Sequence, residues 1–221
     1  MMEKTHFLYF EKDKQKPCLL APDFIDEIAE LEIIDFIKKM SFNFEGTFVD
    51  IGAHIGFYSI PMARIFQNVY SFEPSPFQLS FLVKNKSINQ ANNINIFDCA
   101  LGESVTDKQL YIMGRSGGSN TLLPEIAAEG NPMNTVSVQV RTLDSLNIPK
   151  VEIVKIDAEG FESEIIMGGF ETIRKYRPIM FCEVWKKESH MSKFRQIMNY
   201  LEYEFEYMFE NFPEMAFCKP R

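Results

Sequence analysis

A strand-like run that ends in Asp50 and a second one that ends in Glu73 frame the most informative part of the chain. Residues 47–51 and 69–72 are apolar enough to be buried parallel strands, and a helix is expected between them over residues 55–66. α/β sheets bind ligands at the carboxyl ends of their strands, where one carboxylate can accept hydrogen bonds from both hydroxyls of a ribose. We therefore expect a nucleoside-type ligand, with Glu73 on its ribose. Taken alone, Glu73 would also suit the start of the next helix, where it complements the dipole.

The glycine turn after the first strand indicates which ligand this is. Gly52 and Gly56 lack the G-x-G-x-x-G spacing that lets a pyrophosphate approach a helix N-terminus. Asp50, just ahead of the turn, would repel a pyrophosphate and attract a positive group. S-adenosylmethionine has no phosphate and carries a positive amine and a positive sulfonium, so we expect this cofactor, with Ala53 and His54 against it. Two alternatives stay open, a tight turn without a ligand and His54 as a helix cap.

A third short strand is expected over residues 94–97, followed by Asp98, Cys99 and Ala100. The end of this strand faces the same edge of the sheet, so these three residues are placed to meet the adenine of the cofactor. Pro74, directly after the ribose carboxylate, is included in the expected cofactor site. Asp98 alone could equally be a turn residue.

Two acids follow the strand expected over residues 151–156, and they are the candidates for the chemistry of transfer. Asp157 is our first choice for a base or an acceptor-orienting group and Glu159 the second, because a hydroxyl becomes nucleophilic when a base removes its proton. Asp157 is also expected to contact the cofactor. Either acid could instead cap the following helix. Asp157 with Glu183 could hold a divalent cation, but two acids are too few to predict a metal site.

Residues 114–134 contain four glycines and two prolines and are expected to form a long loop. Ser119 and Asn120 could line an acceptor pocket there, and Arg115 could contact an acidic acceptor; a plain hairpin tip is the alternative. Trp185 and Lys186, just past a later strand, could stack on and grip a sugar, although a buried Trp is as plausible.

Strand-like and helix-like segments alternate from residue 48 onward, which predicts an α/β fold with a mainly parallel sheet. The last strands, near residues 205–209 and 214–218, are separated by a turn and are expected to add an antiparallel hairpin. Before residue 46, a helix starting at Pro22-Asp23 is expected to bury Phe24, Ile28, Leu31, Ile34 and Ile37. We expect one domain over residues 1–221, with a helical cover over about residues 1–45. Further helices are expected over residues 76–88, after Gly160 and over residues 191–201.

The composition narrows the function classes. The chain has 221 residues, of which 46% are hydrophobic, and a net charge of −8. An acidic surface without a basic cluster makes nucleic acid a poor partner. No run approaches the roughly 20 apolar residues of a membrane span, and the first residues lack a signal-peptide core. The four cysteines have no metal-ligand spacing, so a reduced, cytoplasmic protein is expected.

Several ordered motifs resemble the FkbM family of methyltransferases. They are residues 50–59 (DIGAHIGFYS), 72–74 (FEP), 100–102 (ALG), 118–119 (GS) and 154–160 (VKIDAEG), within a likeness that runs from about residue 48 to 184. The resemblance implies a class I methyltransferase (Rossmann-like) fold, a seven-stranded sheet with a reversed last strand, and O-methylation of sugars or natural products. It carries the cofactor role onto Asp50, Gly52, Gly56 and Glu73. The acceptor, a small molecule or carbohydrate, is not specified by it.

Two other functions stay open. A nicotinamide-dependent oxidoreductase uses a similar half-domain, but the glycine spacing is wrong and no Tyr has a Lys four residues later. A scaffold that binds the cofactor without catalysis is less favoured, because Asp157 and Glu159 are both present.

Overall fold

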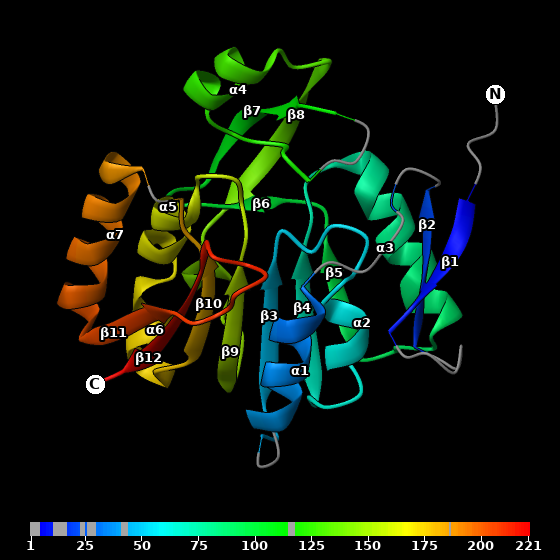
Figure 1. Cartoon of the computed structure of the whole chain (residues 1–221), viewed down its shortest axis with the longest axis horizontal. Helices are drawn as coiled ribbons and strands as arrows, with labels where there is room; N and C mark the ends of the chain where they lie inside the picture. The colour runs from blue at the N-terminus through cyan, green and yellow to red at the C-terminus, as the bar shows by residue number, and fades with distance from the viewer. Residues whose placement is uncertain are drawn as a thin grey trace.

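The computed structural model describes residues 5–10, 17–22, 25, 30–40, 44–114, 118–185 and 187–221. Its centre is a seven-stranded sheet in the order β11-β12-β10-β9-β3-β4-β5 (Figure 1). The strands are β3 (Thr47–Ile51), β4 (Asn68–Phe72), β5 (Ile94–Phe97), β9 (Val151–Ile156), β10 (Ile179–Glu183), β11 (Tyr203–Tyr207) and β12 (Met215–Pro220). The expected strands and the expected antiparallel carboxyl-terminal hairpin are thereby confirmed.

The order and direction of the strands define the fold. Six of them run in the same direction, and β12 is the one reversed strand, paired antiparallel with β10 on one side and β11 on the other. A dinucleotide-binding sheet with strands numbered along the chain has the order 3-2-1-4-5-6. Here the seventh strand is inserted, reversed, between the fifth and the sixth, which confirms the class I methyltransferase fold.

Helices cover the sheet on both faces, and each face has its own apolar core. The alternation of side chains sends Phe48 and Ile153 to one core and Val49 and Val154 to the other. The first core is covered by α1 (Leu31–Met40), α2 (Ser59–Met62) and α3 (Pro76–Ile88). The second is covered by α5 (Glu162–Gly168), α6 (Phe170–Tyr176) and α7 (Glu188–Leu201). Six of the seven strands therefore carry apolar residues toward both sides, whereas β11 has Glu204 and Glu206 exposed on one side.

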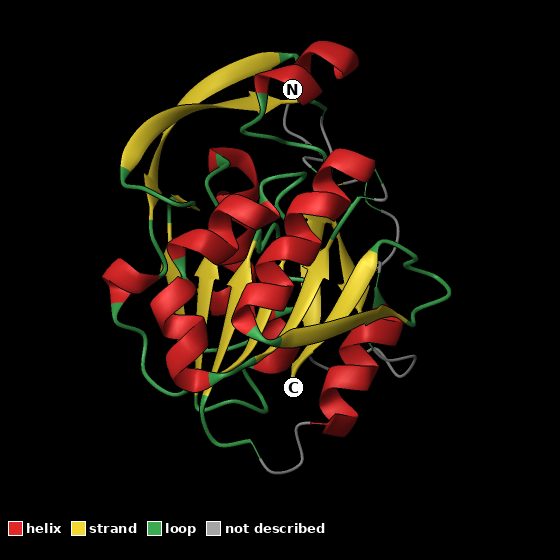
Figure 2. Cartoon of the chain, turned by 90° about the vertical axis from the view of Figure 1, so that its left-hand side faces the viewer, coloured by secondary structure: helices red, strands yellow, loops and turns green. Residues whose placement is uncertain are grey.

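A second, three-stranded sheet stands above the carboxyl ends of the parallel strands. It has the order β6-β8-β7 and consists of β6 (Ala100–Leu101), β7 (Thr106–Ile112) and β8 (Asn134–Arg141). Figure 2 shows the long β7–β8 arm curving over the end of the main sheet, with α4 (Pro124–Gly130) at its tip. The long loop expected over residues 114–134 thus contains a helix. A short 3-10 helix, η2 (Asp144–Leu146), follows β8.

The expected helical cover over about residues 1–45 is wrong for its first part. Strands β1 (Thr5–Tyr9) and β2 (Cys18–Pro22) pair antiparallel, and α1 is the only helix among the described residues before residue 46. Ile34 and Ile37 are buried as expected, whereas Leu31 is exposed. The proposed cap Asp23 and the apolar Phe24 and Ile28 lie outside the described residues.

Two other helices differ from expectation because of glycine. The helix expected over residues 55–66 is reduced to α2, since Gly56 has a φ of +103° and keeps the preceding turn non-helical. The helix after Gly160 is divided into α5 and α6 at Gly169, whose φ of −111° and ψ of 14° lie outside the helical range. The helix α3 has the expected bounds, and α7 begins three residues earlier than expected.

The described part of the chain has no membrane-spanning helix and no disulfide. None of its helices combines the length and the apolar character needed to cross a bilayer. All four cysteines are described, and none of them forms a disulfide; each is buried.

The amino-terminal hairpin is attached to the main sheet through asparagines of α3. The Asn85 amide donates to the carbonyls of Leu20 (3.1 Å) and Ile55 (2.8 Å), and its oxygen accepts from the Leu20 amide (2.6 Å). One turn later, Asn89 exchanges the same pair of bonds with Cys18. These side chains satisfy the backbone groups of β2 that no strand pairs with.

Replacing Asn85 by Ala should lower the free energy of unfolding by about 2–3 kcal/mol, because buried backbone groups of Leu20 and Ile55 lose their partners. Urea unfolding followed by circular dichroism measures this. Asn92→Ala, an exposed change just beyond the same helix, should stay within about 0.5 kcal/mol of wild type. Equal stability of both variants would contradict the role given to Asn85.

Candidate functional site

A cavity of about 260 Å³ opens at the carboxyl ends of the parallel strands, beneath the β7–β8 arm. Its walls come from β3, β4, β9 and β10, so it lies where an α/β sheet binds ligands. Nine of the residues predicted for the site line it: Gly52, Ala53, His54, Glu73, Pro74, Cys99, Ala100, Asp157 and Glu159. Their placement in one cavity is a geometric fact; their roles remain predictions.

Three predicted residues are not among those lining the cavity. Asp98 is exposed and does not line the cavity, although its neighbour Cys99 does. Gly56 supports the turn from within, where its amide donates to the carbonyl of Ala53 at 2.8 Å. Asp50 is fully buried below the turn, where its carboxylate accepts from the Ser59 hydroxyl. Asp50 thus cannot touch a cationic ligand directly, and any effect it has on one must pass through its neighbours.

The neighbour that matters most is Lys155, whose side chain is 3% exposed. The register of the parallel strands places Ser71, Asp50 and Lys155 side by side across β4, β3 and β9, on one face of the sheet. The Lys155 ammonium donates to the carbonyl of Gly52 at 3.0 Å and lies 3.8 Å from Asp50 Oδ1. It is also 3.3 Å from Asp157 Oδ2. One buried cation therefore joins the glycine turn to the acid at the end of β9.

Charge partners reverse the usual effect of burial on this lysine. Burial alone would lower the pKa of Lys155, but the carboxylates of Asp157, Asp50 and Glu30 outweigh it and raise the pKa. For Asp50 the effect of burial has the opposite sign: burial raises the pKa of its carboxyl, and Lys155 and Ser59 oppose that shift. Lys155 is accordingly a permanent cation, and we assign it a positioning role.

Gly52 makes a close approach that a larger residue could not. It has a φ of +75°, and a Cβ at this position would lie 1.8 Å from the carbonyl oxygen of Asp157. The Asp157 amide donates to the carbonyl of Ile51 at 3.1 Å. The glycine turn and the loop after β9 are thus in direct backbone contact, which requires glycine at position 52.

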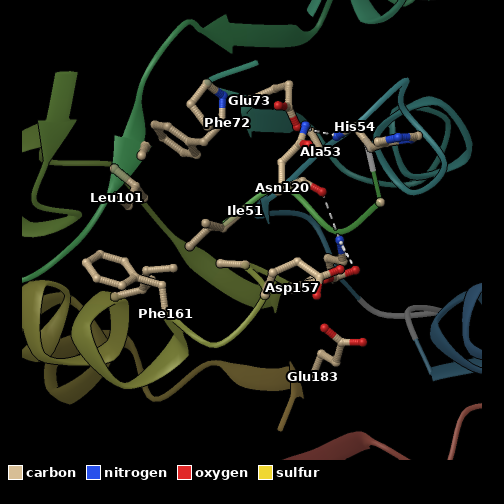
Figure 3. A pocket seen from close by; sticks show the side chains of 18 of the residues that line it. Ile51, Ala53, His54, Phe72, Glu73, Leu101, Asn120, Asp157, Phe161 and Glu183 are labelled. Atoms are coloured by element: carbon tan, nitrogen blue, oxygen red, sulfur yellow. Dashed lines mark hydrogen bonds and ion pairs between the residues drawn. The ribbon is translucent and has the colours of Figure 1, made fainter. Parts of the chain in front are cut away.

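Glu73 follows β4 and turns its carboxylate into the cavity wall (Figure 3). One oxygen accepts from the His54 amide and the other from the Ser75 amide, each at 2.8 Å. A carboxylate oxygen accepts up to two hydrogen bonds, so each oxygen keeps one position for a ligand. Burial raises the pKa of Glu73 to about 7, while the two amides and Lys155 act in the opposite direction.

A group of acids occupies the opposite wall. Oxygen atoms of Asp157, Glu159 and Glu183 all lie within 4.8 Å of one another. Figure 3 shows the Asp157 and Glu183 carboxylates pointing toward each other. Burial raises the pKa of Glu159 to about 8, with Asp157 and Glu162 adding to it. Burial and the nearby Asp157 and Glu159 also raise the pKa of Glu183.

The loop that carries Glu159 is held from two sides. Glu162, at the start of α5, accepts from the amides of Ala158 and Gly160 at 3.1 Å each. The Thr121 hydroxyl, below the β7–β8 arm, donates to the carbonyl of Glu159 at 2.9 Å. Glu159 itself has a φ of +52°, a left-handed conformation that is uncommon outside glycine. The helix-cap alternative for Asp157 and Glu159 has no support here, because no side-chain cap is found at the start of α5.

The remaining wall is apolar and includes part of the arm. Phe72, Leu101 and Phe161 line it near Cys99 and Ala100, and Gly118 and Asn120 line it from the arm. Ser119 is exposed and does not belong to it. Trp185 packs edge-on against His190, with ring centres 5.7 Å apart, and is not among the lining residues. Arg115 and Lys186 lie outside the described residues.

Two important residues were missed by the sequence analysis. Lys155 could have been found, because a lysine inside an otherwise apolar strand must be paired when buried. Glu30 lines the cavity from just before α1, although nothing in the surrounding sequence indicates this. Burial raises the pKa of Glu30 to about 7, opposed by Lys155.

Comparison with known proteins agrees with this geometry. Residues 50–209 match the methyltransferase FkbM domain. The chain is 25% identical over 141 residues to "Methyltransferase 1" of Beauveria bassiana; the match covers 54% of this chain and 57% of that protein. The chain therefore spans little more than half the length of this fungal relative.

Two solved structures share the fold. One is methyltransferase FkbM from Methylobacillus flagellatus, with a TM-score of 0.56 at 17% identity, covering 79% of this chain and 43% of that one. The other, from Streptococcus mutans, was solved in complex with SAH and has a TM-score of 0.52 at 9% identity, covering 88% and 98% of the two chains. Since the family match extends over most of the chain, the protein belongs to the FkbM family of S-adenosylmethionine-dependent methyltransferases.

Proposed function

We propose that this chain transfers a methyl group from S-adenosylmethionine to a hydroxyl oxygen of a sugar, a polysaccharide precursor or a small natural product. The observation that carries the proposal is the arrangement of one cavity: Glu73 on one wall, Asp157 and Glu159 on the other, and the glycine turn between them. The family match supports the methyl transfer, and the acids support oxygen as the acceptor atom.

The residues present fit the cofactor. Glu73 offers one free acceptor position on each oxygen, which suits the two hydroxyls of a ribose. Phe72 and Leu101 provide apolar surface beside Cys99 and Ala100, which suits an adenine. When bound, the cofactor supplies an electrophilic methyl group on a positive sulfur. The acids of the cavity would attract that charge.

The two candidate acids have different surroundings, and we assign them different roles. Lys155 lies 3.3 Å from Asp157, an ion pair that fixes the position of the carboxylate and suits it to orienting the acceptor. Glu159 has no such partner among the described residues, and its pKa of about 8 is close to the pH at which a general base works best. Glu159 is therefore our choice to accept the hydroxyl proton, which reverses the order favoured by the sequence alone.

The same site separates this function from its alternatives. A nicotinamide dinucleotide would bring two negative phosphates into a cavity that acidic side chains line, and these would repel the phosphates. A scaffold would have no need for an acid of raised pKa facing the cavity. Isothermal titration with S-adenosylmethionine and with NADH tests the oxidoreductase alternative. Transfer of an isotope-labelled methyl group to compounds in cell extracts tests the scaffold alternative. Binding without any labelled product would favour the scaffold.

Glu73→Gln should weaken S-adenosylmethionine binding about tenfold to a hundredfold, because a charge-assisted acceptor is replaced by a neutral one. Titration calorimetry at pH 8 measures this, with the exposed Glu103→Gln as a matched control that should bind like wild type. If Glu73→Gln binds as tightly as the control, Glu73 is not the ribose contact.

The wild-type affinity should also depend on pH. Because the pKa of Glu73 is raised to about 7, the carboxyl is mostly protonated at pH 6 and ionised at pH 8. A ligand that needs the ionised form should therefore bind about tenfold more tightly at pH 8 than at pH 6. Glu73→Gln should remove this part of the dependence, and calorimetry across that range tests it.

Glu159→Gln should slow methyl transfer by at least about a hundredfold while leaving cofactor affinity within about twofold of wild type. In the wild type, kcat should rise with pH up to about 8, because the base must lose its proton first. The variant should lack this rise. Normal turnover of Glu159→Gln would move the role of base to another residue, with Asp157→Asn as the next variant to measure.

A further inference from the structure

The group of acids on the cavity wall has a geometry that general acid–base chemistry does not require. One oxygen from each of Asp157, Glu159 and Glu183 lies within 4.8 Å of the other two. Two ligands on opposite sides of one Mg²⁺, Mn²⁺ or Ca²⁺ ion are about 4.2–4.8 Å apart, since each bond is about 2.1–2.4 Å long. The three oxygens therefore span no more than one hard divalent cation.

Glu183 gives independent support for a ligand at this place. Its side chain is 8% exposed, and its Oε2 atom is buried without a hydrogen-bond partner among the described residues. The side chain comes from the end of β10 and points toward Asp157, into the cavity (Figure 3). A buried carboxylate oxygen without a partner is costly, and the cost disappears when a cation binds there.

The excess of acidic over basic side chains in the cavity also favours a bound cation. Five carboxylates line it: Glu30, Glu73, Asp157, Glu159 and Glu183. Lys155 is the one lysine or arginine among its described lining residues, and it is engaged with Gly52 and Asp157. Asp157 meets Lys155 through Oδ2, so Oδ1 is available to another ligand. Carboxylate oxygens are the ligands that hard divalent cations prefer.

We propose that Asp157, Glu159 and Glu183 together bind one divalent cation of the Mg²⁺ or Mn²⁺ class at the carboxyl ends of β9 and β10. Mg²⁺ is usually held by a few carboxylates and keeps other positions for water or substrate. Those positions face the cavity, so the oxygens of an acceptor with two adjacent hydroxyls, or a hydroxyl beside a carboxylate, can complete the shell. This use of the ion rests on the proposed function; its binding does not.

The ion also sharpens the role of Glu159. A cation that holds an acceptor oxygen lowers the pKa of its hydroxyl, which reduces the basicity that a neighbouring carboxylate must supply. Each of the three acids would hold the ion through one oxygen, so the second oxygen of Glu159 can still accept the hydroxyl proton, and the ion would position the acceptor next to the glycine turn. The sequence analysis did not predict a metal, because it could not place Glu159 beside Asp157 and Glu183.

Binding of Mn²⁺ to the full chain, followed by the loss of the electron paramagnetic resonance signal of free Mn²⁺, tests the site without any acceptor. We expect one ion per chain, displaced by excess Mg²⁺. Glu183→Gln and Asp157→Asn should each weaken binding at least tenfold, and the exposed Glu188→Gln should leave it unchanged. No binding by the wild type below millimolar Mn²⁺, or equal binding by all variants, would overturn the proposal.

Cofactor binding serves as the check on folding for Glu183→Gln, because Glu183 is not among the predicted cofactor contacts, and an unchanged circular dichroism spectrum serves for Asp157→Asn. If Glu183→Gln fails this check, Glu159→Gln, at a partly exposed position, replaces it in the same measurement. Mn²⁺ binding without methyl transfer to any acceptor would leave the ion site standing and defeat the proposed function. Methyl transfer that persists in excess EDTA, with no Mn²⁺ bound, would support the proposed function and defeat the ion site.

Discussion

The buried ammonium of Lys155 is the interaction on which the rest of the site depends. It lies between β3 and β9 and reaches Gly52, Asp50 and Asp157 with a single charge. Without it, Asp50 would be an uncompensated charge in the interior. The carbonyl of Gly52, where the turn approaches Asp157, would also lose its hydrogen-bond donor. The parallel register of the two strands puts the lysine there, so the sheet and the site are consequences of the same pairing.

This arrangement divides the cavity into two chemically different halves. On the β4 side, Glu73 is fixed by two backbone amides and surrounded by apolar side chains, which suits a nucleoside. On the β9 and β10 side, acids are crowded together and burial raises the pKa of Glu159 and Glu183. The proposed function therefore assigns donor recognition and acceptor chemistry to different strand ends, with the glycine turn as their common boundary.

Much of this was predictable where the local pattern and the tertiary structure agree. The strand ends at Asp50, Glu73 and Asp157 follow from apolar runs that the structure reproduces nearly residue by residue. The amino-terminal hairpin was not predictable, because its strands depend on bonds from Asn85 and Asn89, more than sixty residues away. The burial of Asp50 was also missed, since a strand-end acid can face the ligand or the sheet, and only the partner Lys155 decides which. The position of Glu159 depends on a left-handed residue and a tether from Thr121, neither of which has a sequence signature.

The hydrogen bond from Thr121 to Glu159 links two parts of the molecule that could otherwise vary separately. The β7–β8 arm is attached to the main sheet through the short β6 strand, whereas the cofactor half of the cavity is built from the sheet itself. Grafting a different arm onto this scaffold would change which molecules can enter without rebuilding the donor half. It would also move the backbone of Glu159, the base that we propose, so selectivity and reactivity would be retuned together in any such chimera.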